Sequence, residues 1–260
     1  MTNISPRNLN FHKEQYWTAA NFLEKYINIS PVSGLRILEV GSAEGGGLNY
    51  FATKNNQCYG LEYSRGRLEI ARELNKSSKI IFIHGDITEA SSYENQLQDK
   101  MDLIICGDVI EHIANEKKAA ALQNMRDLLQ KGGRIYISFP PKYSPFAGHQ
   151  QGLPGWLHRI PYLFLLPDKF YSAILKSQGI RADIISNMLA TKHSRLSIKQ
   201  FEKMVYENGL RILKKDFFLI RPRFKYNYGI PYIGHRCDLP IVREIFNLGA
   251  VYLLQPCAKN

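Results

Sequence analysis

Ile37-Leu38-Glu39-Val40-Gly41-Ser42-Ala43-Glu44-Gly45-Gly46-Gly47 is the stretch that decides the fold of this chain. An apolar run that ends in closely spaced glycines predicts a buried strand that turns sharply into a helix. At such a junction the backbone N–H groups of the helix N-terminus are expected to point towards a ligand. We therefore predict that a cofactor-sized molecule binds here.

The charge beside the glycines indicates which cofactor this is. Gly41-x-Ala43-x-x-Gly46 passes as a dinucleotide fingerprint, and Glu62 follows about twenty residues later, where that motif has a ribose-binding acid. Glu39, however, stands where a dinucleotide would place its pyrophosphate, and two like charges so close cost several kcal/mol. The ammonium and sulfonium groups of S-adenosylmethionine (SAM) suit a carboxylate better, so Glu39 favours SAM over NAD.

With these residues the stretch resembles the first motif of the class I SAM-dependent methyltransferases, (Glu/Asp)-x-Gly-x-Gly-x-Gly, with Ala43 at one glycine position. The resemblance covers roughly residues 35 to 140. It implies an α/β fold with a doubly wound sheet of seven strands, in the order 3-2-1-4-5-7-6 with strand 7 antiparallel. We expect a single methyltransferase domain over residues 1–260.

The resemblance also implies roles for residues at the strand ends. Gly85-Asp86-Ile87 matches the third family motif, in which the aspartate accepts from the adenine amino group and the next apolar residue packs on the ring. Glu62 is expected to accept hydrogen bonds from the ribose hydroxyls. The implied cofactor-binding residues are Glu39, Gly41, Ser42, Ala43, Gly45, Glu62, Tyr63, Asp86, Ile87, Asp108 and Val109.

Apolar periodicity predicts the remaining elements. An amphipathic helix over 11–29 either covers the cofactor or packs against the sheet. Further strands are predicted at 57–63, 79–84, 101–106, 134–140, 210–220 and 249–254, and helices at 47–54, 64–75, 116–130 and 197–207.

Two segments interrupt this pattern. Residues 141–192 lack clear periodicity and are rich in aromatic residues, which predicts a lid that closes over the site and excludes water. Residues 221–246 form a second, basic insertion. Residues 1–140 carry 16 Lys+Arg and 16 Asp+Glu, whereas residues 141–260 carry 18 and 7, so the net charge of +11 lies in the second part. This asymmetry favours an acidic substrate, an anionic membrane surface or nucleic acid as partner.

Asp108-x-x-Glu111-His112 follows the fourth strand, at the edge where open α/β sheets bind ligands. If Asp108 opened a helix, these three residues would share one face. With His149 from the lid they could hold a divalent metal, with Glu111, His112 and His149 as ligands. This resembles some ubiquinone-pathway O-methyltransferases and small-RNA 2′-O-methyltransferases, which have Glu-x-x-Glu-His here. The alternatives are His112 or His149 as a metal-free catalytic base, and a structural or binding role.

We expect methyl transfer to a small-molecule or glycan acceptor, at oxygen. Arginines among aromatic residues in the insertions suit a phosphate-bearing glycan precursor, and the run Leu163 to Leu166 could rest on an anionic membrane. RNA methylation is the first alternative, because basic residues interleaved with tyrosines suit RNA. A non-catalytic SAM-binding protein is the second. The sequence does not predict the oligomeric state.

Cellular location follows from what the sequence does not contain. The four cysteines form no CxxC pair and no zinc spacing. The first ten residues lack an apolar signal region, and the run from Ile160 to Leu166 is far shorter than the ~20 residues of a spanning helix. We expect a cytoplasmic protein.

Overall fold

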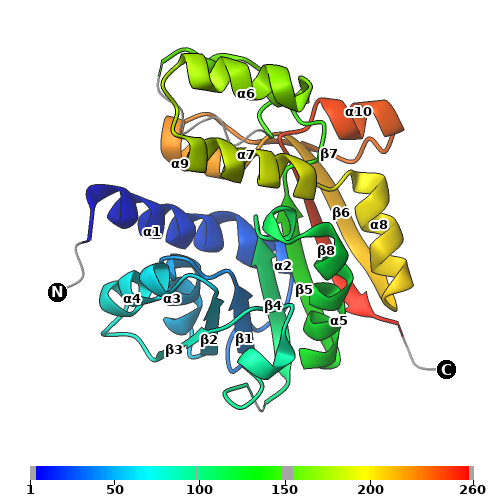
Figure 1. Ribbon diagram of the computed structural model, residues 1–260. Coiled ribbons are helices and arrows are strands. Elements are labelled where there is room, and N and C mark those ends of the chain that lie inside the picture. The colour runs from blue at the N-terminus through cyan, green and yellow to red at the C-terminus, as the bar shows by residue number, and fades with distance from the viewer. Residues whose placement is uncertain (1–3, 98, 148–154, 258–260) are drawn as a thin grey trace.

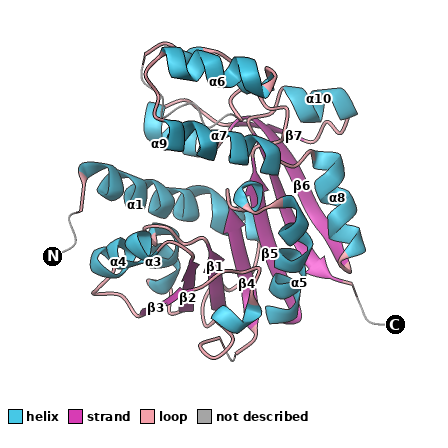
Figure 2. Cartoon of the chain, viewed as in Figure 1, coloured by secondary structure: helices cyan, strands magenta, loops and turns pink. Residues whose placement is uncertain are grey.

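The chain is described by a computed structural model that covers residues 4–97, 99–147 and 155–257. One sheet of eight strands forms its centre, in the order β3-β2-β1-β4-β5-β8-β6-β7, with helices on both faces (Figures 1 and 2). The strands are β1 (Arg36–Val40), β2 (Gln57–Glu62), β3 (Ile80–His84), β4 (Met101–Gly107), β5 (Leu129–Phe139), β6 (Leu210–Ile220), β7 (Ile233–His235) and β8 (Gly249–Pro256).

The predicted strand order is confirmed, with one strand added. β1 to β5 pair in parallel, and β8 lies antiparallel between β5 and β6, as the seventh strand of the predicted order should. The additional strand, β7, pairs antiparallel with β6 at the sheet edge and comes from the insertion over 221–246. It has only three residues, too few for apolar alternation to show it in the sequence.

The helices are short and cover the sheet in two layers (Figure 1). A π-helical turn, Ala19–Leu23, joins α1 to α2, so the predicted helix over 11–29 exists with an irregular centre. The helices are α1 (Pro6–Thr18), α2 (Glu24–Ile27), α3 (Gly46–Ala52), α4 (Arg65–Leu74), α5 (Lys118–Leu128), α6 (Asp168–Ser177), α7 (Ala182–Ser194), α8 (Ile198–Glu207), α9 (Arg223–Tyr228) and α10 (Pro240–Ile245).

Each face of the sheet has its own apolar core. Successive side chains of a strand point to opposite faces, so the neighbours Ile37 and Leu38 on β1 belong to different cores, and both are fully buried. The first core includes residues of α5 and α8, and the second includes residues of the turn after α1 and of α2, α3 and α4. Burial on both faces explains why the parallel strands are continuously apolar in sequence.

The prediction of an irregular segment over 141–192 is wrong for its second half. α6 and α7 form there and enclose a separate apolar core that includes Phe164, Tyr171, Leu175 and Ile185. Both helices lie beyond the end of the sheet, beside α10 (Figure 1). α7 buries only Ile185, Met188 and Ser194 among its 13 residues, so its helical period is weak in the sequence.

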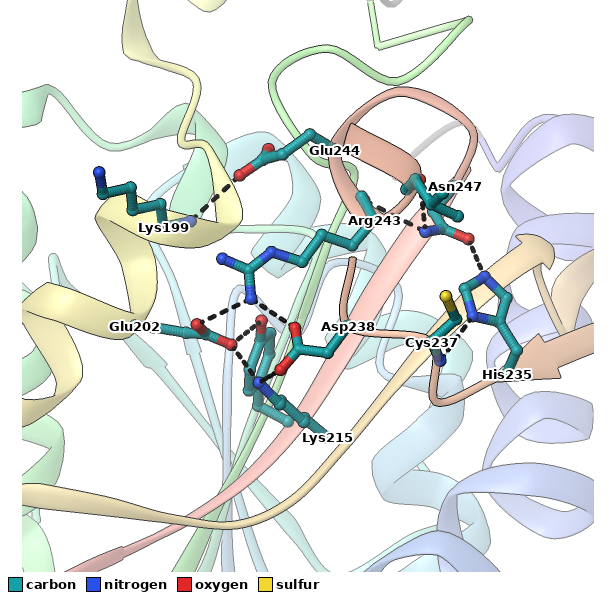
Figure 3. A network of polar contacts seen from close by, with 11 residues as sticks. Lys199, Glu202, Lys215, His235, Cys237, Asp238, Arg243, Glu244 and Asn247 are labelled. Carbon is teal, nitrogen blue, oxygen red and sulfur yellow. Dashed lines mark hydrogen bonds and ion pairs between the residues drawn. The ribbon is translucent and has the colours of Figure 1, made fainter. Parts of the chain in front are cut away.

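A network of charged side chains holds the second insertion to the sheet (Figure 3). Lys215 on β6 lies 3.0 Å from Glu202 on α8 and 2.5 Å from Asp238 in the insertion. Arg243 on α10 pairs with the same two carboxylates, at 3.2 Å from Glu202 and more closely with Asp238. The Tyr252 hydroxyl donates to Glu202 at 3.2 Å. Because these side chains share partners, each one restricts the movement of the others. The network therefore holds the segment between β6 and β8 in place.

Within the described residues, no helix combines the length and the apolar character that crossing a membrane requires.

Candidate functional site

A cavity of about 620 Å³ lies at the carboxyl ends of the parallel strands. Its size falls within the range of about 300–1,000 Å³ for small-molecule sites. The ends of β1, β2 and β4 form its floor, α1 and the following π-helical turn cover it, and residues 221–223 close its far side. α1 packs on α3 and contacts α9, which places it across this end of the sheet (Figure 1).

The turn between β1 and α3 has the tight geometry that the glycines predict. Gly41 adopts a φ of +68°, and a Cβ at this position would lie 2.4 Å from Cγ2 of Val109. Ala43 also takes a positive φ of 50°. Its N–H donates to Oε2 of Glu62 at 3.0 Å, which holds it in that conformation. The backbone therefore passes close to the β4 loop, and the cavity opens beside it.

The expectation that this junction offers free N–H groups to a ligand is wrong at two positions. The N–H of Ala43 donates to Glu62, and the N–H of Gly46 donates to Oε1 of Gln15 on α1 at 3.2 Å. Gln15 also donates to the carbonyl of Ser42. These two donors are engaged by protein groups and are therefore not available to a pyrophosphate.

Two predicted cofactor residues lie outside the cavity wall. Ser42 is fully buried, and its Oγ has no hydrogen-bond partner among the described residues. Gly45 caps α3, and a Cβ there would lie 2.7 Å from the ring of Phe82. The other predicted cofactor residues, Glu39, Gly41, Ala43, Glu62, Tyr63, Asp86, Ile87, Asp108 and Val109, all line the cavity.

Carboxylates dominate the cavity floor. Burial raises the pKa of Glu39, a hydrogen bond from the Leu48 backbone opposes this and the nearby Glu62 adds to it, with a net pKa of about 8. Oε2 of Glu39 is buried and has no hydrogen-bond partner among the described residues. A cation next to Glu39 would supply the missing partner and favour the ionised form.

Backbone donors orient two further carboxylates. Glu62 accepts from the N–H of Ser64 at 2.8 Å as well as from Ala43. Asp86 accepts from the N–H of Thr88 at 2.8 Å through Oδ1. Carboxylates fixed in this way can still accept hydrogen bonds from hydroxyl or amino groups of a ligand, because each oxygen has two lone pairs.

Asp108 is bound by arginines that our sequence prediction missed. It follows β4 with a φ of +56°, and Nη2 of Arg221 lies 2.5 and 2.6 Å from its two carboxylate oxygens. Arg223 adds a longer contact of 3.4 Å. Burial alone would lower the pKa of Arg221, but the charge of Asp108 outweighs it and the pKa is raised. In the sequence Arg221 and Arg223 stand in a basic stretch after β6, which looks like any basic loop and does not mark them as site residues.

The segment after Asp108 differs from the predicted helix. Val109 has a φ of −120°, and only Ile110–His112 form a short 3-10 helix, so Asp108, Glu111 and His112 do not share a helical face. Glu111 is fully buried, neither of its carboxylate oxygens has a hydrogen-bond partner among the described residues, and it does not line the cavity. Burial first, and then Asp108, raise its pKa to about 8.

His112 does line the cavity. Desolvation lowers the pKa of its imidazole, and Asp108 partly opposes this. The other predicted base, His149, lies outside the described residues. Within those residues no three His, Cys, Asp or Glu side chains are grouped as a metal site. The predicted metal ligands Glu111 and His112 are therefore not brought together, because Glu111 turns into the interior.

Among the described residues, segments other than 141–192 line the cavity, and the lid over 141–192 stays a prediction. No described residue of that segment lines the cavity. Phe11, Glu14, Gln15 and Thr18 of α1 contribute side chains instead, together with Arg221, Pro222 and Arg223. The sequence left open whether the N-terminal helix covers the site or packs on the sheet, and the structure shows that it does both.

Comparisons with known proteins agree with this geometry. A family model described as a methyltransferase domain matches residues 37–133. A search of curated protein sequences gives no match. Among solved structures, three similar chains span nearly the whole of this one.

The magnesium protoporphyrin IX methyltransferase of Synechocystis, solved with bound S-adenosylhomocysteine (SAH), is 16% identical over 98% of this chain and 89% of its own, with a TM-score of 0.55. A SAM-dependent methyltransferase from Clostridium acetobutylicum is 12% identical over 95% and 92%, with a TM-score of 0.57. The plantazolicin methyltransferase BamL is 11% identical over 95% and 85%, with a TM-score of 0.56. At these identities the likeness establishes a shared fold.

The sheet and the cavity at its carboxyl edge define the Rossmann-like fold of the methyltransferases. Residues 37–133 match a methyltransferase domain, and the solved structures that share the fold include SAM-dependent methyltransferases. The cavity fits SAM, because Glu39 lines it and has a carboxylate oxygen without a hydrogen-bond partner among the described residues. The prediction of SAM over NAD is confirmed.

Proposed function

We propose that the enzyme methylates an oxygen atom of a small-molecule or glycan acceptor bound in the outer part of this cavity. The observation that carries the proposal is the extent of the cavity beyond the residues expected to hold SAM. Its wall continues to Tyr136 and Ser138 on β5, Phe218 on β6 and Val251 on β8. α1 covers this outer part as well. An enclosed space with aromatic walls suits a small molecule or a sugar better than a folded polymer.

The residues that bind SAM follow from their positions. Bound SAM supplies a methyl group on a positively charged sulfur. We propose that Glu39 faces the ammonium group, that Glu62 accepts from the ribose hydroxyls, and that Asp86 accepts from the adenine amino group. Ile87 and Val109, which line the cavity, supply apolar surface for the adenine ring. Gly41, Ala43, Tyr63 and Asp108 complete the wall, whereas Ser42 and Gly45 support the turn from behind.

His112 is the proposed base for an acceptor hydroxyl. Its lowered pKa keeps the imidazole neutral at pH 7, which is the form that accepts a proton. Holding the acceptor in line with the methyl group supplies most of the rate enhancement, because such a displacement needs little covalent help. The second base, His149, and a divalent metal stay predictions.

The test begins with calorimetric titration of the protein with SAM and SAH, with and without Mg²⁺ or Mn²⁺. Labelled SAM is then incubated with a small-molecule extract, a glycan fraction and total RNA. Label in the first or second pool supports the proposal. Label in RNA alone, together with RNA retention that falls steeply with salt, would replace it with the RNA methyltransferase alternative. Tight SAM binding with no label in any pool would favour the non-catalytic alternative.

The structure limits which residues of the run from Leu163 to Leu166 could contact an anionic membrane. Leu163 and Phe164 are buried in the core of the 141–192 segment, so they cannot reach a lipid surface. Leu165, Leu166 and Phe170 are exposed, with Phe170 at 63%. We propose these three, beside the exposed Lys169, as the lipid-contacting residues. Phe170→Ser should reduce sedimentation with phosphatidylglycerol vesicles, whereas Ile81→Ser, an exposed apolar residue on β3, should not.

A further inference from the structure

Arg221 lines the cavity and has N–H donors that protein groups leave unused. One of its terminal nitrogens, Nη2, contacts both carboxylate oxygens of Asp108. Among the described residues, Nε and Nη1 have no hydrogen-bond partner, and the side chain lines the cavity. A guanidinium carries five N–H groups in a rigid plane that matches the two oxygens of a carboxylate or phosphate. Both nitrogen pairs that could bind two oxygens at once include Nη2, which Asp108 occupies, so Arg221 can still donate single hydrogen bonds to an oxyanion from Nε or Nη1.

The position of Arg221 is fixed before any ligand binds. Its side chain crosses the backbone of Gly249, where a Cβ would lie 3.0 Å from Nε and 3.1 Å from Cδ and Cγ. The pairing with Asp108 holds the far end. A donor that is already ordered loses little conformational entropy when a ligand binds.

Arg223 stands beside it with only weak protein contacts. It lies 3.4 Å from Asp108 and 4.0 Å from Glu14, both longer than the usual 2.7–2.9 Å of a charge-assisted hydrogen bond. Glu14 already accepts from Asn227 at 2.7 Å. The side chain of Arg223 is 39% exposed and lines the cavity, so it is free to turn towards a ligand.

We propose that Arg221 and Arg223 form an oxyanion-binding subsite, which selects acceptors that carry a carboxylate or a phosphate group. This inference rests on the proposed function and names the acceptor class for the same cavity. Asp108 affects the anion affinity of the subsite in two ways. It orients Arg221, and its negative charge repels the incoming anion. The subsite lies beside the wall of Tyr136 and Ser138, where the body of the acceptor would bind.

The experiment uses the full chain saturated with SAH. Calorimetry first measures SAH affinity for each variant. Inorganic phosphate is then titrated and followed by phosphorus NMR, and acetate by proton NMR. Wild type should bind at least one probe saturably, with at least fivefold weaker binding in Arg221→Gln and Arg223→Gln. Lys225→Gln is the matched control, because it removes the same charge from α9 at an exposed position outside the cavity and should bind like wild type.

Asp108→Asn gives a change in the opposite direction. Asparagine tolerates the positive φ at this position and removes the competing charge, so phosphate or acetate should bind at least twofold more tightly. A purely structural role for the arginines would not produce this gain. Tighter binding of phosphate than of acetate would assign a phosphate-bearing acceptor, and the reverse a carboxylate.

Three results separate the possibilities. If SAH binds but neither probe does, or if all variants bind the probes equally, the subsite is overturned and the proposed function stands. If the two arginine variants lose SAH affinity in the same proportion as phosphate affinity, the arginines hold the cofactor carboxylate and the subsite is again overturned. If wild type binds phosphate but not SAH, the proposed function fails and the anion site remains.

Discussion

Glu62 at the end of β2 accepts a hydrogen bond at 3.0 Å from the backbone N–H of Ala43, in the middle of the turn between β1 and α3. The contact therefore links Glu62, which is expected to bind the ribose, to the turn that is expected to lie beside the methionine portion of SAM. The side chain of Glu62 also accepts from Ser64, and the residue is only 7% exposed. Its carboxylate is therefore held in place before the cofactor arrives.

Glu62→Ala should weaken SAM binding by at least about 1.5 kcal/mol, the lower value for a hydrogen bond to a charged group. This corresponds to roughly a tenfold rise in Kd. The substitution removes the acceptor for the ribose and also leaves the N–H of Ala43 without its partner. Calorimetric titration with SAM measures the change.

Glu62→Gln is the matched variant, because it keeps the shape and removes the charge. Its amide has one acceptor oxygen in place of two, so its SAM affinity should fall between wild type and Glu62→Ala. Wild-type affinity in Glu62→Ala would show that Glu62 does not contact the cofactor.

The raised pKa of Glu39 predicts that SAM binding depends on pH. In the free protein the carboxyl, with a pKa of about 8, is protonated at neutral pH. A bound cation favours the ionised form, so binding releases a proton and SAM affinity should rise with pH, at most tenfold per unit. Calorimetry between pH 5.5 and 7 tests this, below the ordinary pKa of an α-amino group.

Glu39→Gln isolates this effect from other groups that titrate in the same range. The variant cannot release the proton, so its SAM affinity should be weaker at pH 7 and change less with pH than that of wild type. Parallel pH profiles for the two proteins would show that Glu39 stays protonated in the complex, which would contradict its proposed role.

The sequence predicts most of the sheet because burial on both faces leaves a strong signal. Ile37 to Val40 is apolar apart from Glu39, and Leu103 to Cys106 is continuously apolar. The ends of these two strands form part of the floor of the cavity. Glu39, Glu62, Asp86 and Asp108 lie there as the motifs imply. Local sequence is enough here because strand, turn and carboxylate follow one another along the chain.

The rest of the site depends on contacts between distant residues. Arg221 reaches Asp108 across 113 positions of sequence, and no local pattern distinguishes it from the basic residues around it. Glu111 has the spacing expected of a ligand, but the φ of +56° at Asp108 and the 3-10 geometry after it turn the carboxylate into the interior. In both cases backbone conformation and tertiary packing, which composition and spacing do not encode, decide the role.

The same buried carboxyl predicts how stability changes with pH. The pKa of Glu111 is about 8 in the folded protein and close to 4.5 in the unfolded chain. Between these values the folded state binds the additional proton, so stability falls as pH rises, by about 1 kcal/mol per pH unit. Urea unfolding of wild type at pH 5, 6.5 and 8 should show this loss. Glu39 acts in the same direction.

Glu111→Gln removes one of the two contributions. The variant should therefore lose less stability than wild type between pH 5 and pH 8, and Glu39→Gln/Glu111→Gln should lose less again. Equal losses in wild type and Glu111→Gln would mean that the buried carboxyl titrates at its ordinary pKa.

Closure of the cavity by α1 depends on Gly46, which is not among the residues that line the cavity. A Cβ on Gly46 would lie 2.0 Å from the carbonyl oxygen of His12, a backbone atom that cannot turn away. Gly46→Ala should therefore push α1 off the turn, with a loss of about 1–3 kcal/mol in unfolding free energy. It should also weaken SAM binding, because Gln15 and Thr18 line the cavity from this helix.

Gly66→Ala on α4 is the control for the same chemical change. No heavy atom lies within 4 Å of its Cβ position, so the added methyl group meets open space. Alanine in a helix is favoured over glycine by about 0.5–1 kcal/mol, and this variant should be as stable as wild type or more so. Urea unfolding measures the stability of the two variants, and calorimetric titration measures their SAM affinity. If Gly46→Ala binds SAM as tightly as Gly66→Ala does, α1 is not needed to close the site, and the cofactor is held by the strand ends alone.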